Sequence, residues 1–283
     1  MKIALVGVGL IGGSFALAVK RRRLHVEVIG VDKNSDNIQK ALQLGIIDGE
    51  ASLEEAVKQS DVVILAIPVD ALTSLLPQVM DLVDDGQLVI DFGSTKGAVC
   101  TAVEDHPKRH CFVAAHPMAG TEYSGPEAAF STLFEDKIMI LCEEEKSGDE
   151  QLNLFQEICK NLAMRVVNMT PKDHDLHIAY VSHLSHISSF ALSTTVLAKE
   201  KDEKHIFAMA GSGFASTVRL AKSSPAMWSP IFRQNQKNLS GALDTYIAQL
   251  QQFKHVLDAK DAEAMESFMK EANKIRPIID GIK

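Results

Sequence analysis

The sequence predicts an α/β domain with a mostly parallel sheet over residues 1–169, followed by an all-α domain over residues 170–283. Three observations predict this arrangement. Short apolar runs rich in β-branched residues alternate with helical stretches up to Asn168, as in a parallel sheet with helices on both faces. A glycine-rich turn follows the first apolar run. Beyond Thr170 the strand pattern stops, and long helical stretches make up the rest of the chain.

The first expected strand, residues 2–6, runs directly into the glycine-rich turn at residues 7–13. The turn fits the pattern G-x-G-x-x-G: one glycine allows a tight turn, one lets the backbone approach a pyrophosphate, and one allows close packing of the next helix. That helix, expected over residues 14–22, directs free N–H groups at the phosphates. The expected cofactor-binding residues of the turn are Gly7, Gly9, Leu10, Ile11 and Gly12.

A second apolar run, residues 26–31, ends in Asp32, twenty residues after Gly12. An acidic side chain at this point accepts hydrogen bonds from the adenosine ribose of NAD and repels the 2′-phosphate of NADP. The first domain is therefore expected to be of the Rossmann type and to bind NAD. A secretory signal peptide is the competing interpretation of the same N-terminus, but four glycines in its apolar part and the presence of Asp32 disfavour it.

The remaining elements of the first domain follow in alternation. The run at residues 62–66 is apolar throughout, as expected for a strand that is covered on both faces. Further strands are expected over residues 88–91, 111–115, 137–142 and 165–169. Helices are expected over residues 35–44, 52–60, 70–82 and 149–162.

Residues that could bind a ligand or take part in a reaction follow the ends of these strands. In open parallel sheets, ligands bind at the carboxyl ends of the strands. Such ends carry the glycine turn, Asp32, Pro68, Ser94 with Lys96, and His116 with Glu122. We therefore expect one ligand site along this edge, with Pro68 among the residues that contact the cofactor.

Four long helices are expected in the second domain, over residues 172–199, 203–222, 226–257 and 259–280. Thr170 is a suitable helix cap, and Pro171 fits the first helical turn. Helices of this length need another surface to cover their apolar faces. The sequence therefore predicts a two-fold homodimer built on the C-terminal helices.

The composition limits the possible partners. Apolar residues make up 46% of the 283 residues and charged residues 23%, as in a folded globular enzyme. The net charge of −8 disfavours nucleic acid, and no apolar run is long and glycine-free enough to span a bilayer. The four cysteines show no C-x-x-C spacing, so we expect reduced thiols in a cytoplasmic protein.

Four motifs together resemble the prephenate and arogenate dehydrogenases of tyrosine biosynthesis, over nearly the whole chain. The first, GVGLIGGS at residues 7–14, is shared by many dehydrogenases. The other three are specific in this order and spacing: DFGSTK at residues 91–96, HPMAGTEYSG at 116–125 and RLAKSSPAMW at 219–228.

The resemblance implies an oxidative decarboxylation. The ring hydroxyl of prephenate loses its proton, a hydride leaves the same carbon for NAD, and carbon dioxide departs as the ring becomes aromatic. His116 is the expected catalytic base, because histidine has an ordinary pKa near neutrality; activity should then fall below a pH of roughly 6–7. The resemblance implies that Ser94 orients His116 or the hydroxyl; a serine that only caps the following helix is the alternative interpretation.

The same resemblance implies how an acidic protein receives an anionic substrate. Arg219 matches the family residue that binds the ring carboxylate, to which a planar guanidinium can donate two charge-assisted hydrogen bonds. Glu122 and Trp228 are expected to line the pocket. Family members often carry a basic and an acidic residue where this chain has Ala215 and Ser216, so a contact made there is not expected.

Four histidines at residues 174, 177, 183 and 186 could suggest a metal site. At 100° per residue, the first pair and the second pair face opposite sides of one straight helix, so all four cannot converge on zinc. No metal is expected. His186 resembles a family histidine that lines the substrate pocket, whereas His174 and His177 are expected on the surface.

Several alternatives stay open at this point. Prephenate and arogenate differ by a keto or an amino group, and the sequence does not choose between them. A β-hydroxyacid dehydrogenase or an imine reductase also joins a Rossmann domain to a helical one, but usually works with a lysine or aspartate in the helical part. A dinucleotide-sensing regulator would need an effector or nucleic-acid surface. No regulatory domain is expected after the helices, so inhibition by tyrosine would act at the active site.

Overall fold

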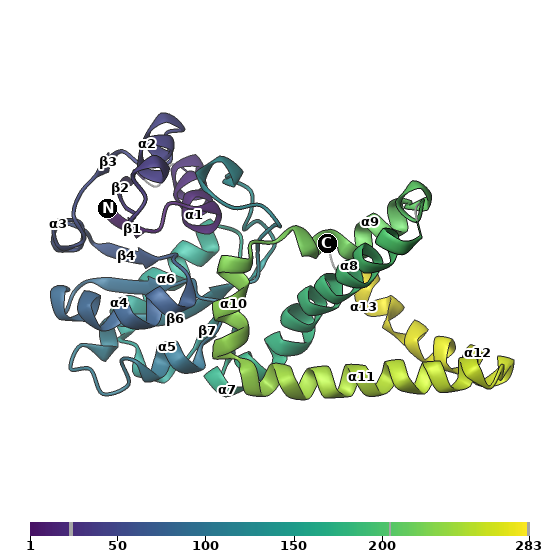
Figure 1. Ribbon diagram of the computed structural model, residues 1–283. Helices are drawn as coiled ribbons and strands as arrows, with labels where there is room; N and C mark the ends of the chain where they lie inside the picture. Colours follow the sequence, from purple (N-terminus) through teal and green to yellow (C-terminus); the bar gives the residue numbers. More distant parts are fainter. Residues whose placement is uncertain (23–24, 204, 282–283) are drawn as a thin grey trace. The chain divides into compact units, whose positions relative to one another are not determined.

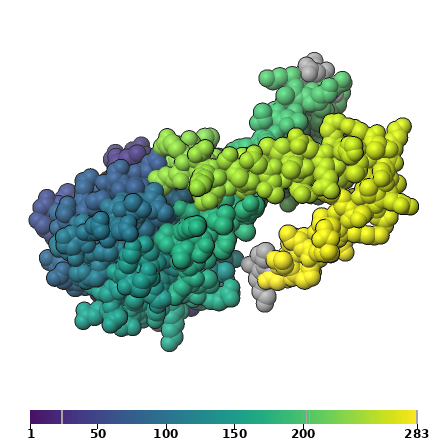
Figure 2. All heavy atoms as spheres, turned by 90° about the horizontal axis from the view of Figure 1, so that it is seen from below, coloured from purple at the N-terminus to yellow at the C-terminus, as the bar shows by residue number. Residues whose placement is uncertain are grey.

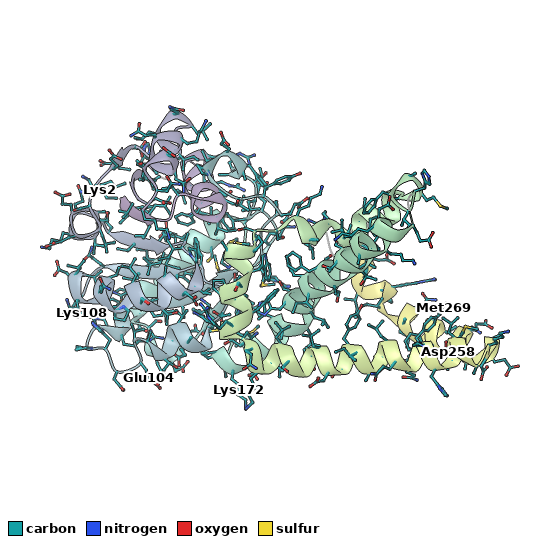
Figure 3. The ribbon with its side chains drawn as sticks, viewed as in Figure 1. Lys2, Glu104, Lys108, Lys172, Asp258 and Met269 are labelled. Carbon is teal, nitrogen blue, oxygen red and sulfur yellow. The ribbon has the colours of Figure 1, made fainter. Side chains whose placement is uncertain are left out.

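Two units make up the chain in this computed structural model, Met1–Asn235 and Gln236–Lys283. The structure describes residues 1–22, 25–203 and 205–281. Charged side chains such as Glu104 and Lys172 lie on the outer surface of the first unit (Figure 3). No helix in the described ranges has both the length and the apolar character needed to cross a membrane.

An eight-stranded sheet organises the first unit within the described residues (Figure 1). Its strand order is β3-β2-β1-β4-β5-β6-β7-β8, and every neighbouring pair is parallel except β6 and β7. The mostly parallel sheet is as predicted, and the two-residue β3 is an addition. The strands are β1 Lys2–Val6, β2 Glu27–Val31, β3 Gly49–Glu50, β4 Val62–Leu65, β5 Leu88–Asp91, β6 Phe112–Pro117, β7 Ile138–Cys142 and β8 Arg165–Met169.

The order of the strands creates a crevice beside β1. The chain runs outward from β1 to β2 and β3, then crosses back so that β4 pairs with the other side of β1. Loops that leave β1 and β4 therefore diverge to opposite faces, which is where open α/β sheets bind dinucleotides. The glycine turn follows β1, and Pro68 follows β4.

Helices cover both faces of the sheet because alternate strand residues point to opposite sides. On one face, α1 (Leu10–Arg21), α2 (Ser35–Gln43) and α6 (Asp149–Asn161) bury Phe15, Ile38 and Phe155 against the sheet. On the other face, α3 (Leu53–Lys58), α4 (Val69–Leu82) and α5 (Gly97–Thr101) bury Val57, Leu76 and Val99. The two apolar cores hold the strand ends in register.

The helices after residue 170 are shorter than predicted. The stretch expected as one helix over residues 172–199 is α7 (Pro171–Ile178), a π-helical turn (Ala179–His183) and α8 (Leu184–Asp202).

The stretch over residues 203–222 is not one helix either. It contains α9 (Ser212–Val218) and short 3₁₀ turns, because His205 has a positive φ of 90° and Gly211, directly before α9, disfavours a helix interior. The helix expected over residues 226–257 divides into α10 (Pro225–Gln234) and α11 (Gln236–Asp258), with the buried Asn235 between them.

The second unit is a short helical assembly of its own. It consists of α11, α12 (Ala262–Ala272) and α13 (Arg276–Asp280). The last two helices replace the single helix expected over residues 259–280. Figure 2 shows this unit as a band from yellow-green to yellow that doubles back after α11. The rings of Phe253 and Phe268, with centroids 5.2 Å apart, join α11 to α12.

Candidate active site

The glycine turn is closed by contacts that leave no room for side chains. Gly7 has a φ of 93°, and a Cβ added to it would lie 2.3 Å from the carbonyl oxygen of Ala66. A Cβ on Gly12 would lie 2.1 Å from the carbonyl oxygen of Gly7. Both glycines are therefore required by the packing of β1, β4 and α1, independently of any ligand.

Gly9 has a different reason to be glycine. A Cβ added there would meet no atom within 4 Å, so the packing of the chain does not require its absence. Gly9 caps α1 without a side-chain hydrogen bond, and the first amides of the helix, including those of Leu10 and Ile11, are oriented along its axis. An open cradle at a free helix N-terminus fits a pyrophosphate, and hence the dinucleotide NAD.

Asp32 closes the cradle from the end of β2. Its Oδ2 accepts a hydrogen bond from the Val8 amide at 3.2 Å, and its Oδ1 accepts one from the Asn34 amide at 2.9 Å. These bonds hold the carboxylate beside the glycine turn, where the ribose of NAD is expected. Pro68 is exposed at the first position before α4, across the crevice from β1.

His116 lies at the end of β6 and is buried, with 8% of its surface exposed. Its Nδ1 is 2.8 Å from Nε2 of His174, which belongs to α7. The Nδ1 of His174 is in turn 2.8 Å from Oδ1 of Asp175. The three side chains form a continuous chain of hydrogen bonds that ends at His116.

The expectation that His174 lies on the surface is wrong, because its side chain is fully buried. The prediction assumed one straight helix through all four histidines. The π-helical turn at Ala179–His183 changes the rotation per residue, so that His174 and His183 are both buried. His177 is exposed.

Asp175 is anchored by the chain that follows β5. Its Oδ1 accepts a hydrogen bond from the Lys96 amide at 2.8 Å, and its Oδ2 accepts one from the Gly97 amide at 2.9 Å. The side-chain amide of Asn235 donates to the backbone carbonyl of Asp175 at 2.6 Å. Sequence reasoning did not single out Asp175 or Asn235; an adjacent His-Asp pair in a first helical turn is the signal that could have found the former.

Burial keeps these imidazoles neutral. It lowers the pKa of His116 well below 6.5, and the neighbouring His174, Lys96 and His183 act in the same direction. Burial also lowers the pKa of His174, despite its hydrogen bond to Asp175. Burial acts to raise the pKa of Asp175, but the bonds from His174 and the two amides outweigh it, so the net shift is downward.

Lys96 points into the protein, away from the ligand edge on which the sequence placed it. Its side chain and that of Asp91 are both fully buried and form an ion pair. The ammonium also donates to the Ala115 carbonyl at 2.8 Å, and Asp91 accepts from the amides of Gly93 and Ala115. This pair ties the end of β5 to β6, one residue before His116.

Ser94 lies in the same turn and is half-buried. Within residues 25–203 no hydrogen bond joins Ser94 to His116. Its role in orienting His116 or the substrate hydroxyl therefore stays a prediction.

Arg219 and Glu122, both expected at the substrate, are brought together. Nη1 of Arg219 donates to Oε2 of Glu122 at 2.6 Å, and the Arg219 side chain stays 50% exposed while that of Glu122 is 11% exposed. Ala215 and Ser216, on the preceding α9, are exposed.

His186 and Trp228 are also brought together, with stacked rings 3.5 Å apart between centroids. Burial lowers the pKa of His186, and the charge of Arg219 contributes in the same direction. Trp228 packs against Val69 at the start of α4, and its Nε1 has no hydrogen-bond partner among the residues that the structure describes. The predicted pocket residues therefore meet in two pairs, and Trp228 contacts the residue that follows Pro68.

Helix α10, which carries Trp228, is held against the sheet domain by polar contacts. Arg233 forms an ion pair with Asp70. The amide of Gln234 donates to Thr73 at 3.0 Å, and its oxygen accepts from Thr95 at 2.7 Å. These contacts fix α10 to α4 and to the loop that follows β5.

A dinucleotide cradle and a buried, neutral histidine at the same edge of one parallel sheet indicate an NAD-dependent dehydrogenase. Residues 15–168 match the family model described as prephenate dehydrogenase, nucleotide-binding domain, and residues 170–271 match the model described as prephenate dehydrogenase, dimerization domain. The chain belongs to the prephenate dehydrogenase family.

Individual relatives agree with this assignment. The chain is 33% identical over 277 residues to the prephenate dehydrogenase of Bacillus subtilis (strain 168), which covers 97% of this chain and 75% of that relative. The crystal structure of prephenate dehydrogenase from A. aeolicus, in complex with hydroxyphenyl propionate and NAD+, has a TM-score of 0.90 and 32% identity, covering 99% of this chain and 98% of that chain.

A Synechocystis arogenate dehydrogenase structure has a TM-score of 0.78 and 27% identity, covering 99% of this chain and 100% of that one. Together these findings confirm the predicted family, fold class and cofactor.

Proposed function

We propose that this enzyme oxidises and decarboxylates prephenate to 4-hydroxyphenylpyruvate. The observation that carries the proposal is the buried His116 at the end of β6, whose pKa is lowered by burial and whose Nδ1 is engaged by His174. When bound in the crevice, NAD supplies the hydride acceptor. The protein must hold the substrate, take a proton from its hydroxyl and allow carbon dioxide to leave.

His116 is proposed as the general base. Its Nδ1 is engaged by His174, so Nε2 is the nitrogen left to accept the hydroxyl proton as the hydride leaves the same carbon. The bond to the ring carboxylate then breaks, and its electron pair completes the aromatic ring. The new phenol oxygen takes a proton back, for which the protonated His116 is the nearest donor. Ser94 is proposed to orient the hydroxyl from the neighbouring strand end.

Arg219 is proposed to hold the ring carboxylate. The guanidinium has five N–H donors, and half of its side chain remains exposed although Nη1 donates to Glu122. A carboxylate can therefore add to the pair or displace Glu122 from it. His186 and Trp228 are proposed as the adjoining wall of the pocket, which would exclude water from the reacting ring.

The test of this function is NADH formation with each of two substrates and two cofactors. We expect turnover with prephenate and NAD, and weak turnover with NADP because Asp32 opposes a 2′-phosphate. The Synechocystis relative makes arogenate the second candidate. Turnover of arogenate alone would select that alternative, and no NADH from either substrate would refute both.

Replacing Arg219 by alanine is expected to raise KM for prephenate about ten- to a hundredfold, because a charge-assisted carboxylate contact contributes roughly 1.5–3 kcal/mol. Initial rates over a range of prephenate concentrations measure the effect. Glu122→Gln is the matched control, since it breaks the same ion pair but keeps the arginine; its KM should change far less. An unchanged KM in Arg219→Ala would remove this residue from substrate binding.

We also propose that the chain forms a two-fold homodimer through its C-terminal helices. Apolar side chains of the second unit remain exposed in the single chain, and the family model for this region is described as a dimerization domain. Met269, labelled in Figure 3, is 52% exposed. The others include Ile247, Leu250, Leu257, Ile275, Ile278 and Ile279.

Light scattering in dilute solution is expected to give twice the mass of one chain. The double variant Ile275→Glu, Ile278→Glu should shift the protein toward the monomer, because buried unpaired carboxylates oppose association. Lys270→Glu, at an exposed charged position of α12, is the control for added negative charge. A monomeric wild-type protein would contradict the proposal.

We also propose a domain boundary at residues 169 and 170 and a cytoplasmic location. The boundary between the domains at residues 169 and 170 is supported by the family models, which end and begin at residues 168 and 170. A cytoplasmic location is supported by the four cysteines, all of which are free thiols.

A further inference from the structure

We propose that Asp175 and His174 are positioning residues, which hold His116 in the tautomer whose Nε2 is free to accept a proton. This inference rests on the proposed function, in which His116 is the general base. It assigns a task to a buried pair of side chains on α7 that the proposed reaction does not otherwise use.

The carboxylate of Asp175, when ionised, can only accept hydrogen bonds. Its two oxygens accept the amides of Lys96 and Gly97 at 2.8 and 2.9 Å, so hydrogen-bond donors face both of them. Hydrogen bonds from these two amides stabilise the ionised carboxylate relative to the protonated carboxyl group. The carboxylate is therefore ionised, and the downward shift of the Asp175 pKa agrees with this.

An ionised Asp175 determines the tautomer of His174. The 2.8 Å contact between Asp175 Oδ1 and His174 Nδ1 requires a hydrogen on Nδ1, because two lone pairs at this distance would repel. Burial keeps the His174 ring neutral, so its single N–H hydrogen is at Nδ1. Its Nε2 then carries a lone pair and acts as an acceptor.

The tautomer of His116 follows from that of His174. His116 Nδ1 lies 2.8 Å from the acceptor Nε2 of His174, so Nδ1 of His116 must be the donor. Since His116 is also neutral, its Nε2 carries no hydrogen. That nitrogen is the one required to accept the hydroxyl proton. If every hydrogen bond in this chain had the opposite direction, His174 Nδ1 would carry a lone pair. That lone pair would face the ionised Asp175 carboxylate at 2.8 Å and be repelled by it.

The surroundings of Asp175 fix its orientation. A Cβ added to Gly97 would lie 2.8 Å from Oδ2 of Asp175, so glycine there leaves room for the close contact. Asn235, directly after α10, donates a hydrogen bond to the backbone carbonyl of Asp175. His174 itself has no exposed surface and cannot touch substrate, so it acts through His116. Asp175 and His174 thereby link the loop after β5 and helix α7 to the reacting group.

Nuclear magnetic resonance of the histidine side chains, in protein labelled with ¹⁵N-histidine, reads the tautomers directly. Spectra of the full-length wild-type enzyme near pH 7 should show His116 and His174 with hydrogen on Nδ1 and a bare Nε2. The variant His116→Asn identifies the signals of His116 by their loss. A wild-type His116 with its hydrogen on Nε2 would overturn the proposal, whether or not any variant folds.

Two variants test the consequence for catalysis. Asp175→Asn places an N–H where an acceptor stood, and His174→Phe removes the acceptor for His116 but keeps a ring. Both should leave His116 in a mixture of tautomers and lower kcat by about ten- to a thousandfold, a loss bounded by the contribution of the base itself. The KM for prephenate should change little.

Asp173→Asn and His177→Phe are the matched controls, because these residues lie on the same helix but outside the hydrogen-bonded chain. Both should keep the wild-type tautomer and kcat. An unchanged, wild-type kcat in Asp175→Asn and His174→Phe would overturn the proposal. A loss of activity in both variants while His116 still carries its hydrogen on Nδ1 would also overturn it.

The histidine spectra report the tautomers whether or not the enzyme converts prephenate. A wild-type enzyme that fails to oxidise prephenate would therefore refute the proposed function, while the spectra still decide the tautomer of His116.

Discussion

Replacing His116 by asparagine is expected to lower kcat about 10²–10⁴-fold, the usual contribution of a general base. Asparagine has a similar size but cannot take the hydroxyl proton as the hydride leaves. Stopped-flow or steady-state NADH formation measures the change, and NAD titration by intrinsic fluorescence serves as the control. NAD affinity should stay nearly unchanged because the glycine cradle is formed by β1, β4 and α1. A variant with most of its activity would require another base, and His186 would be the first candidate to test.

The pH dependence of the wild-type enzyme gives a second readout of the same residue. The neutral imidazole is the active form, because a protonated imidazole cannot accept the hydroxyl proton. Because burial, followed by the neighbouring His174, lowers the pKa of His116 well below 6.5, the neutral form persists to lower pH. The acid limb of kcat/KM should therefore lie below pH 6.5, which corrects the range of 6–7 expected from an ordinary histidine. His116→Asn should lack this limb.

Replacing Lys96 by methionine is expected to reduce the free energy of unfolding by about 3–5 kcal/mol, because it leaves Asp91 as a buried charge without its partner. Methionine has a similar length, so the lost charge is the main change. Urea denaturation at neutral pH measures the effect. We also expect lower activity, since the pair ties β5 to β6 beside His116.

Two controls separate the buried charge from other causes. Lys58→Met breaks an exposed pair with Glu54 and should cost less than about 1 kcal/mol. The double variant Lys96→Met, Asp91→Leu removes both buried charges and should recover part of the lost stability. A loss below 1 kcal/mol in Lys96→Met alone would contradict the role given to this pair.

The sheet domain could be predicted from the sequence because its signals are local. Each strand is a short apolar run, and the glycine turn and Asp32 lie at fixed distances within one β-α-β unit. The two-residue β3 has too little pattern to be found. The ends of α7 and α8 were missed because a π-helical turn has no simple periodic signature, and this hid the burial of His174.

The arrangement inside the site depended on contacts between distant segments. His116 and His174 are separated by 58 residues and meet only in the folded chain. Lys96 could be placed at a strand end, but its inward direction follows from Asp91 and the Ala115 carbonyl. Glu122 and Arg219 were each expected in the pocket, whereas their mutual ion pair required the fold to bring the turn after α9 and the loop after β6 together.

The stoichiometry of the reaction tests the central proposal most directly. Prephenate labelled with ¹⁴C in its ring carboxylate should yield one labelled carbon dioxide, one NADH and one 4-hydroxyphenylpyruvate for each molecule consumed. Samples without NAD should release no labelled gas above background, and His116→Asn should lower all three products together. NADH formed without labelled carbon dioxide, or labelled carbon dioxide released at the same rate without NAD, would contradict an oxidative decarboxylation by this enzyme.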